Sequence, residues 1–417
     1  MIHICFVLYD KTGRYSKFTG TTMLSLFENT ITPPQLPSIT VHLLHDHTLT
    51  TDNREKFLQL AARFGQAVKF YNVEELCQKE LEKFSRLIPF MKTARTTIGT
   101  FYKFLIQHVL PQEIEKVIYL DADLLVNLDI AELWQIDLGE RPLGAVPVYL
   151  QDKNEADGLE RMRRGFNLPM LGIVKDTDYF NAGVFVMNLK RLRGEEEKIL
   201  DGMKFRGEHP EFWMFDQCIW NYCFSTEYLK LPLKFNREVF KVRTQDGGRV
   251  EKKIYHFTAN NSFWSFGLDT RDNLNRLWLD YFIKSPWFDS ETFGRICETV
   301  KTLDANLKMN MLKLSSVMNV KSRVFILRER DLKSFDKLSE IFFIKDDEEV
   351  IILSEEMTVQ NLLDKMNVRR GKNFFFVVVP NFPFKALTDS GFVFGEDFLN
   401  GMEFLSACDF YRFVEAM

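Results

Sequence analysis

The chain has 417 residues, of which 46% are hydrophobic and 27% charged, close to the averages for globular proteins. This composition excludes disordered, collagenous and membrane-embedded classes, and at about 150 residues per domain the length predicts two or three domains. The formal net charge is −4, and no run of lysine and arginine is long enough to follow a phosphate backbone, which argues against nucleic acid as a partner.

Short apolar runs predict buried strands in the first half of the chain, at residues 2–8, 39–44, 67–71, 117–120, 143–148 and 183–188. Helical patterns lie between the early runs. The clearest covers residues 96–110, where Ile98, Phe101, Leu105 and Val109 fall on one face. This alternation predicts an α/β fold with a mostly parallel sheet and helices on both faces. Sheets of this kind bind ligands beyond the carboxyl ends of their strands.

The end of the chain has a strand pattern of its own. A polar, helix-like stretch at residues 291–320 predicts a connector, and apolar runs recur at 323–327, 350–353 and 373–379. Residues 321–417 carry 13 basic and 17 acidic side chains, whereas the first 320 residues carry 41 of each. We therefore expect a first domain at 1–290, a helical connector at 291–320, and a smaller α/β domain of unknown function at 321–417.

The cysteines and the N-terminus bear on location. The six cysteines are scattered and include no second close pair that would complete a zinc site, which favours a reducing compartment. The first residues lack a basic region before their short apolar run, so we interpret them as a strand and not a signal peptide. No stretch approaches the roughly 18 apolar residues that span a bilayer. We expect a cytoplasmic protein, with peripheral contact at the inner face of the membrane left open.

One motif stands at a strand end. The chain has neither G-x-G-x-x-G nor G-x-x-x-x-G-K-[ST], which argues against dinucleotide and P-loop enzymes. Instead, the apolar run at 117–120 leads directly into Asp121, Ala122 and Asp123. Residues i and i+2 of a strand face the same side, so the two carboxylates would repel unless a divalent cation lies between them and a group such as a diphosphate. The structural alternative is a pair of turn-forming aspartates after a strand.

Several motifs in the same order resemble glycosyltransferase family 8. They are VIYLDADLLV at 117–126, LW at 133–134, DLG at 137–139, DYFNAGVFVMNL at 178–189 and FDQ at 215–217. That family includes bacterial lipopolysaccharide galactosyl- and glucosyltransferases and glycogenin. The resemblance extends from the first strand to about Trp264 and leaves the C-terminal part outside. It implies a GT-A fold, which is Rossmann-like, a UDP-sugar donor, Mn²⁺ or Mg²⁺, and transfer with retention at the anomeric carbon.

The resemblance also implies which residues bind the metal. Asp121 and Asp123 match the family's metal-binding Asp-x-Asp, with Ala122 between them at the donor. His256 matches a distant histidine that completes the metal site. Without the family, a lone histidine after an apolar strand is more simply a core residue. Two carboxylates and one imidazole suit Mn²⁺ or Mg²⁺ better than zinc.

Further donor contacts are implied by the same resemblance. It places the donor sugar against Asn181, Gly183, Asp216 and Gln217, the diphosphate near Lys103, and the uracil and ribose near Tyr9 and Asp10. Asp216, which meets sugar hydroxyls, and Gln217, near the reacting carbon, are the catalytic candidates. Each match has a structural alternative: a turn at 181–183, a helix cap at 216–217, a solvated helix lysine at 103 and a strand end at 9–10.

The sequence also departs from the family pattern. The family has Gly and a phosphate-facing Lys where this chain has Ala259 and Ser262, so Lys253 or Arg271 would have to supply the cation, or turnover is slower. Residues 146–149, VPVY, replace an acidic residue that often follows the next strand, which leaves the donor sugar open. The histidines at 42, 45 and 47 straddle a strand end and a loop, and we expect them to be non-catalytic.

Three functions remain for comparison. The first is a metal-dependent retaining hexosyltransferase that moves glucose or galactose from a UDP-sugar to a hydroxyl of a lipid-linked glycan, in lipopolysaccharide or surface polysaccharide synthesis. The second is a non-catalytic UDP-sugar-binding scaffold, which the missing Lys favours. The third is a self-glycosylating primer like glycogenin, which would need an exposed tyrosine.

Overall fold

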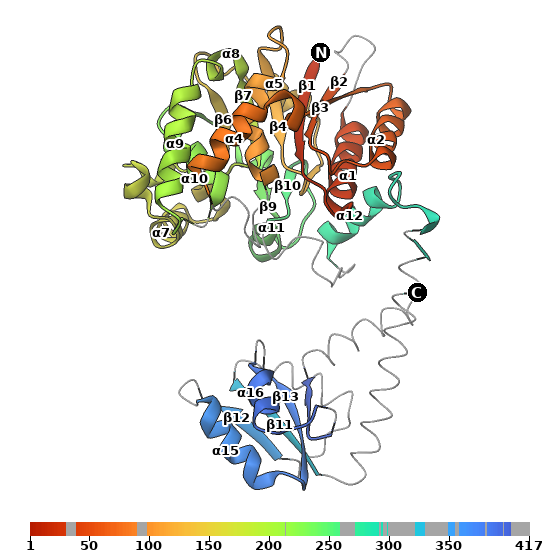
Figure 1. The fold of residues 1–417 in the computed structure, drawn as a ribbon, viewed down its shortest axis with the longest axis vertical. Helices are drawn as coiled ribbons and strands as arrows, with labels where there is room; N and C mark the ends of the chain where they lie inside the picture. The colour runs from red at the N-terminus through yellow and green to blue at the C-terminus, as the bar shows by residue number, and fades with distance from the viewer. Residues whose placement is uncertain are drawn as a thin grey trace. The chain divides into compact units, whose positions relative to one another are not determined.

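The computed structural model describes residues 1–30, 39–89, 98–212, 214–258, 272–291, 293, 294, 298, 322–329, 349–354, 358–379, 382–394 and 396–401. The chain divides into two compact units, Met1–Asp289 and Ser290–Met417. Most of the predicted connector at 291–320 lies outside the described residues. Each unit has its own sheet (Figure 1).

The main sheet of the first unit has seven strands in the order β3-β2-β1-β4-β7-β6-β8. In chain order they are β1 (Ile2–Leu8), β2 (Ile39–His45), β3 (Ala67–Asn72), β4 (Lys116–Leu120), β6 (Leu143–Ala145), β7 (Val184–Asn188) and β8 (Leu229–Lys230). All pairings are parallel except those of β7, which runs antiparallel to both β4 and β6. The predicted α/β fold is confirmed, and the sheet is mixed.

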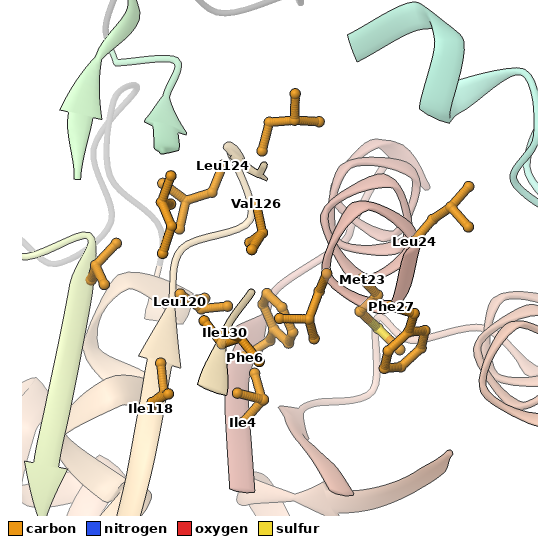
Figure 2. Close-up of a cluster of buried hydrophobic side chains, with 14 of the residues drawn as sticks. Ile4, Phe6, Met23, Leu24, Phe27, Ile118, Leu120, Leu124, Val126 and Ile130 are labelled. Carbon is orange, nitrogen blue, oxygen red and sulfur yellow. The ribbon is translucent and has the colours of Figure 1, made fainter. Parts of the chain in front are cut away.

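Helices cover both faces of this sheet (Figure 1). One face packs against α1 (Arg14–Asn29), α2 (Thr51–Arg63) and α12 (Asn273–Phe282), and the other against α4 (Gln78–Leu87), α9 (Glu196–Glu208) and α10 (Phe215–Phe224). Each face of the sheet packs into its own hydrophobic core. Alternate residues of β1 point into the two cores, with Ile4 and Phe6 in the first and Cys5 in the second. Figure 2 shows the first core gathered around α1, β1, β4 and β5 (Leu124–Val126).

Two predicted elements differ from the structure. The helix expected at 96–110 is described from Ile98 and is a 3₁₀ helix, η1 (Ile98–Leu105), that continues as the short α5 (Ile106–Val109). Six of the eight η1 residues are buried, including five in succession at 101–105, so the apolar pattern reflects burial on several sides and not one helix face. The strand expected at 143–148 ends at Ala145, because Pro147 lacks a backbone donor and η2 (Val148–Gln151) begins directly after it.

A second, three-stranded sheet brings distant segments to the end of β4. It has the order β5-β10-β9, in which β10 (Ile254–His256) runs antiparallel to β5 and parallel to β9 (Arg237–Glu238). The remaining elements of this unit are α3 (Val73–Leu76), α6 (Ala131–Trp134), α7 (Glu155–Gly165), η3 (Leu168–Leu171), η4 (Asp176–Asp178), α8 (Leu189–Leu192), η5 (Leu233–Phe235) and α11 (Val239–Gln245).

The second unit contains an entirely parallel sheet, β12-β11-β13-β14. Its elements are β11 (Ser322–Arg328), β12 (Glu349–Leu353), α15 (Val359–Arg369), β13 (Asn373–Val378), α16 (Phe384–Asp389) and β14 (Phe398–Asn400). The run at 374–378 is fully buried, as expected for a central parallel strand. The smaller α/β unit predicted from the sequence is therefore confirmed.

Cys5, Cys77, Cys218 and Cys223 are buried and free, and Cys297 and Cys408 lie outside the described part of the chain. Among the helices that the structure describes, none is long and apolar enough to cross a membrane.

Candidate functional site

Two carboxylates and one imidazole meet beyond the end of β4. Asp121 follows β4, Asp123 lies two residues on, and His256 is the last residue of β10. His256 Nε2 lies 3.2 Å from Asp123 Oδ1 and 3.8 Å from Asp121 Oδ2. One ligand atom from each residue lies within 4.8 Å of the others, which is the arrangement of a three-ligand cation site.

Backbone pairing holds these residues together. The Asp121 N–H donates to Gly183 O at 2.9 Å, and the Phe257 N–H donates to Asp123 O at 2.9 Å. Burial acts to lower the pKa of His256, but the carboxylates of Asp123, Asp121 and Glu238 together outweigh it and raise the pKa above its ordinary value. The carboxylates therefore favour positive charge at this point, from a proton or from a metal.

A buried ammonium lies beside this group. Lys103 on η1 places Nζ 2.7 Å from Asp216 Oδ2 and 3.4 Å from Asp121 Oδ1. Burial acts to lower the pKa of Lys103, but Asp121 and Asp216 oppose it and raise the pKa overall. Burial raises the pKa of Asp216, with Lys103 opposing the rise and Asp121 adding to it. Lys103 is only 4% exposed, so the alternative of a solvated helix lysine does not hold.

The turn at 181–183 packs directly against the carboxylates. A Cβ atom on Gly183 would lie 2.2 Å from His256 Cε1 and 3.0 Å from Asp121 Oδ2, so no side chain fits there. The Gly183 N–H donates to Asn181 Oδ1 at 2.9 Å. Asn181 is 7% exposed and lies between Gly183 and Asn236, whose Nδ2 donates to the same oxygen at 2.8 Å.

Asp216 and Gln217 lie at the start of α10. Gln217 is buried, accepts a hydrogen bond from the Ala182 N–H at 3.1 Å and donates to the Tyr179 hydroxyl at 3.0 Å. These bonds fix the side-chain amide next to the 181–183 turn. Phe215, directly before Asp216, has a φ of 30°, which is costly for a bulky residue and marks a backbone held by its surroundings.

Tyr9 and Asp10 follow β1 at the same edge of the sheet. Asp10 is buried, and its carboxylate accepts from the backbone N–H groups of Tyr15 and Ser16, both at 2.9 Å. Its own N–H donates to Thr48 Oγ1 at 2.7 Å. Asp10 thus orders the chain at the start of α1, while Tyr9 is half-buried.

The histidines at 42, 45 and 47 do not meet one another. His42 contacts the Tyr71 hydroxyl and His3, His45 contacts the Asp46 carbonyl, and His47 pairs with Glu74. Asp46, His47 and Glu74 could together approach one ion, but the last two are exposed. Asp46 already accepts from Tyr102 and Thr48.

Some of the residues that depart from the family pattern lie outside the described part of the chain. Ala259, Ser262 and Arg271 lie outside the described residues. Lys253 is ion-paired with Glu251 at 2.5 Å and lies 3.9 Å from Asp246. In the segment at 146–149, Pro147 forms an antiparallel bridge with Phe180, which continues the sheet edge next to the 181–183 turn.

Sequence reasoning missed two residues of this site. The Tyr119 hydroxyl donates to Asp121 Oδ1, and it could have been found because it precedes Asp121 by two residues on the same strand face. Asn236 accepts from His256 Nδ1 at 3.0 Å. It follows the short η5 turn, 20 residues before His256, and carries no motif that would have found it.

The comparison with protein families decides the affiliation. The model of "Glycosyl transferase family 8" matches residues 6–266, which include every site residue described above. This chain belongs to glycosyltransferase family 8. It is therefore a glycosyltransferase, an enzyme that transfers a sugar.

The individual proteins that this chain matches are distant in sequence. General stress protein A of Bacillus subtilis is 23% identical over 257 residues, which cover 59% of this chain and 79% of that protein. The galactosyltransferase LgtC, solved with donor and acceptor sugar analogs, superposes with a TM-score of 0.52 at 20% identity, covering 70% of this chain and 99% of LgtC. The bifunctional glycosyltransferase WbbM superposes with a TM-score of 0.51 at 16% identity, covering 69% of this chain and half of WbbM. These structures show the shared GT-A-like fold.

Proposed function

We propose that this family 8 chain is a metal-dependent, retaining hexosyltransferase that moves glucose or galactose from a UDP-sugar to a hydroxyl of a glycan acceptor. The observation that carries the proposal is the meeting of Asp121, Asp123 and His256 next to the buried Lys103–Asp216 pair. The galactosyltransferase LgtC, with its donor and acceptor analogs, supports a donor and an acceptor site in one fold. A growing, lipid-linked lipopolysaccharide or surface polysaccharide is the proposed acceptor.

The donor set fits a divalent cation. Asp121, Asp123 and His256 would hold Mn²⁺ or Mg²⁺, because oxygen ligands and one imidazole suit these ions and leave room for phosphate oxygens. The missing side chain of Gly183 leaves room for the His256 imidazole beside Asp121. When bound, the cation would draw charge from the bond that breaks and stabilise the departing UDP.

The chain's own residues would orient the donor. Asp216, held by Lys103, would accept hydrogen bonds from sugar hydroxyls, and Gln217 would lie near the reacting carbon. Asn181 and Gly183 would contact the sugar, Tyr9 and Asp10 the nucleoside, and Ala122 would also lie at the donor. Because Asp216 is paired with an ammonium, it is better placed to orient a sugar than to attack one.

A donor screen tests this function. UDP-glucose, UDP-galactose and UDP-N-acetylhexosamines are incubated with the full chain and Mn²⁺, and released UDP is measured. We expect hydrolysis of a UDP-hexose that EDTA abolishes and that Asp123→Asn lowers by at least about 100-fold. The matched control is Asp280→Asn, a carboxylate exposed on α12, which should keep full activity. Equal activity in EDTA, or an active Asp123→Asn protein, would refute the metal assignment.

Two further measurements with the same donors distinguish the other two functions. A non-catalytic scaffold would bind UDP-sugars in calorimetry without hydrolysing any donor, with or without glycan acceptors. The ion pair of Lys253 with Glu251 favours this alternative, because it holds Lys253 away from the role of the missing family Lys. A self-glycosylating primer would gain the mass of one or more hexoses after incubation with UDP-glucose.

We also propose that different parts of the chain have different functions. Residues 1–290 would carry the transferase activity, 291–320 would connect, and 321–417 would form a separate domain whose function stays open. The two compact units and the extent of the family match, 6–266, support this division.

A further inference from the structure

One buried amide joins the two sides of the candidate site. Asn236 is fully buried at the turn between η5 and β9. Its Oδ1 lies 3.0 Å from His256 Nδ1, and its Nδ2 lies 2.8 Å from Asn181 Oδ1. Its backbone is held as well, since Gln151 Nε2 donates to Asn236 O at 2.7 Å. The amide is thus fixed between a proposed metal ligand and a proposed sugar-contacting residue.

The orientation of this amide follows from a backbone group that can only donate. The Gly183 N–H requires an acceptor, so the Asn181 atom that faces it is Oδ1. The Asn236 atom that meets the same oxygen must then be its Nδ2 donor. The other end of Asn236 is therefore an acceptor, and His256 must carry a proton on Nδ1. This assignment directs the remaining nitrogen, Nε2, toward Asp121 and Asp123.

We propose that Asn236 is a positioning residue that holds His256 in its Nδ1–H tautomer, with Nε2 presented as a ligand to the cation. The proposal rests on the proposed metal site and adds a residue outside it. Partners that accept from the distal N–H of a metal-bound histidine fix its ring and raise its basicity, and their removal typically costs about 10- to 100-fold in metal affinity.

Three variants test the proposal through Mn²⁺ affinity, measured by EPR titration of the full chain without donor. Asn236→Leu removes the acceptor at similar volume, and we expect the dissociation constant for Mn²⁺ to rise by about 10-fold or more. Asn236→Asp keeps an acceptor for Nδ1–H but cannot donate to Asn181 Oδ1, so its dissociation constant for Mn²⁺ should rise by less than that of Asn236→Leu. The matched control is Asn53→Leu, a buried amide that accepts from Trp287 Nε1 at 2.7 Å, and it should leave Mn²⁺ affinity unchanged.

A spectroscopic readout separates positioning from general loss of structure. Pulsed EPR should detect nitrogen coupling from a bound imidazole in the wild type and in Asn236→Asp, and a weaker coupling in Asn236→Leu. If Asn236→Leu does not fold, as judged by circular dichroism, Asn236→Ala takes its place with the same expected loss. Wild-type affinity and coupling in a folded Leu or Ala variant overturns the proposal alone. Unchanged Mn²⁺ affinity in His256→Ala overturns the metal assignment, and this inference with it.

Discussion

Gly183→Ala tests whether His256 can reach its position beside Asp121 and Asp123 only because residue 183 has no side chain. The added Cβ would lie 2.2 Å from His256 Cε1 and 2.8 Å from its Nδ1. Carbon atoms in contact lie about 3.5 Å apart or more, so the imidazole would have to retreat by about 1 Å. Gly183 is not among the glycines with positive φ, so the contact and not backbone strain sets the effect.

The expected effect of Gly183→Ala is larger on function than on stability. A displacement of about 1 Å at a reacting site typically costs about 100-fold in kcat/KM, whereas overpacking costs about 1–3 kcal/mol of unfolding free energy. The assays are UDP-hexose hydrolysis, Mn²⁺ titration and urea denaturation. Gly165→Ala is the control, because its added Cβ would meet no atom within 4 Å beyond its chain neighbours and its own helix backbone. A folded Gly183→Ala protein with wild-type kcat/KM and Mn²⁺ affinity would refute the reasoning.

Three further predictions address charge, pH and domain division. Lys103→Met leaves Asp216 and Asp121 without their ammonium, and urea denaturation should show a loss of about 3 kcal/mol or more; a loss below about 1 kcal/mol would contradict it. Burial, together with the charge of His3, lowers the pKa of His42 to about 3. The unfolded chain therefore takes up this proton first as pH falls below about 6.5, and stability should drop by about 2 kcal/mol by pH 5. His42→Gln should remove most of that drop, and an equal drop in both proteins would count against it. Finally, a chain ending at Lys321 should still bind UDP with Mn²⁺ in calorimetry, and a folded but non-binding fragment would contradict the division.

The parts of the fold that sequence reasoning predicted are those encoded locally. The run Ile2–Leu8 is apolar apart from His3 and forms β1 with the predicted bounds. The antiparallel direction of β7 could not be predicted in the same way, because a strand buried on both faces has the same apolar pattern in either direction. The 3₁₀ geometry of η1 was missed for a related reason, since burial on every side hides the helical period.

The site shows the same distinction between local and distant information. Asp121 and Asp123 are separated by one residue of a strand end, so their proximity follows from spacing alone. The place of His256 depends on the pairing of β10 with β5, which no local pattern contains, and only the family resemblance pointed to it. Asn236 depends on that same pairing and on β9, so sequence reasoning had no route to it.

The charges at this site favour a bound cation. Asp121, Asp123 and Asp216 bring three carboxylates together, and Lys103 lies closest to Asp216, at 2.7 Å. Asp121 shares that ammonium only at 3.4 Å, so the excess negative charge remains on the side that faces His256. The raised pKa of His256 is the response of the protein to that excess when no cation is bound. A divalent cation at the same point would offset the excess more completely than one proton. Lys103 would meanwhile stay with Asp216 on the side proposed for the donor sugar.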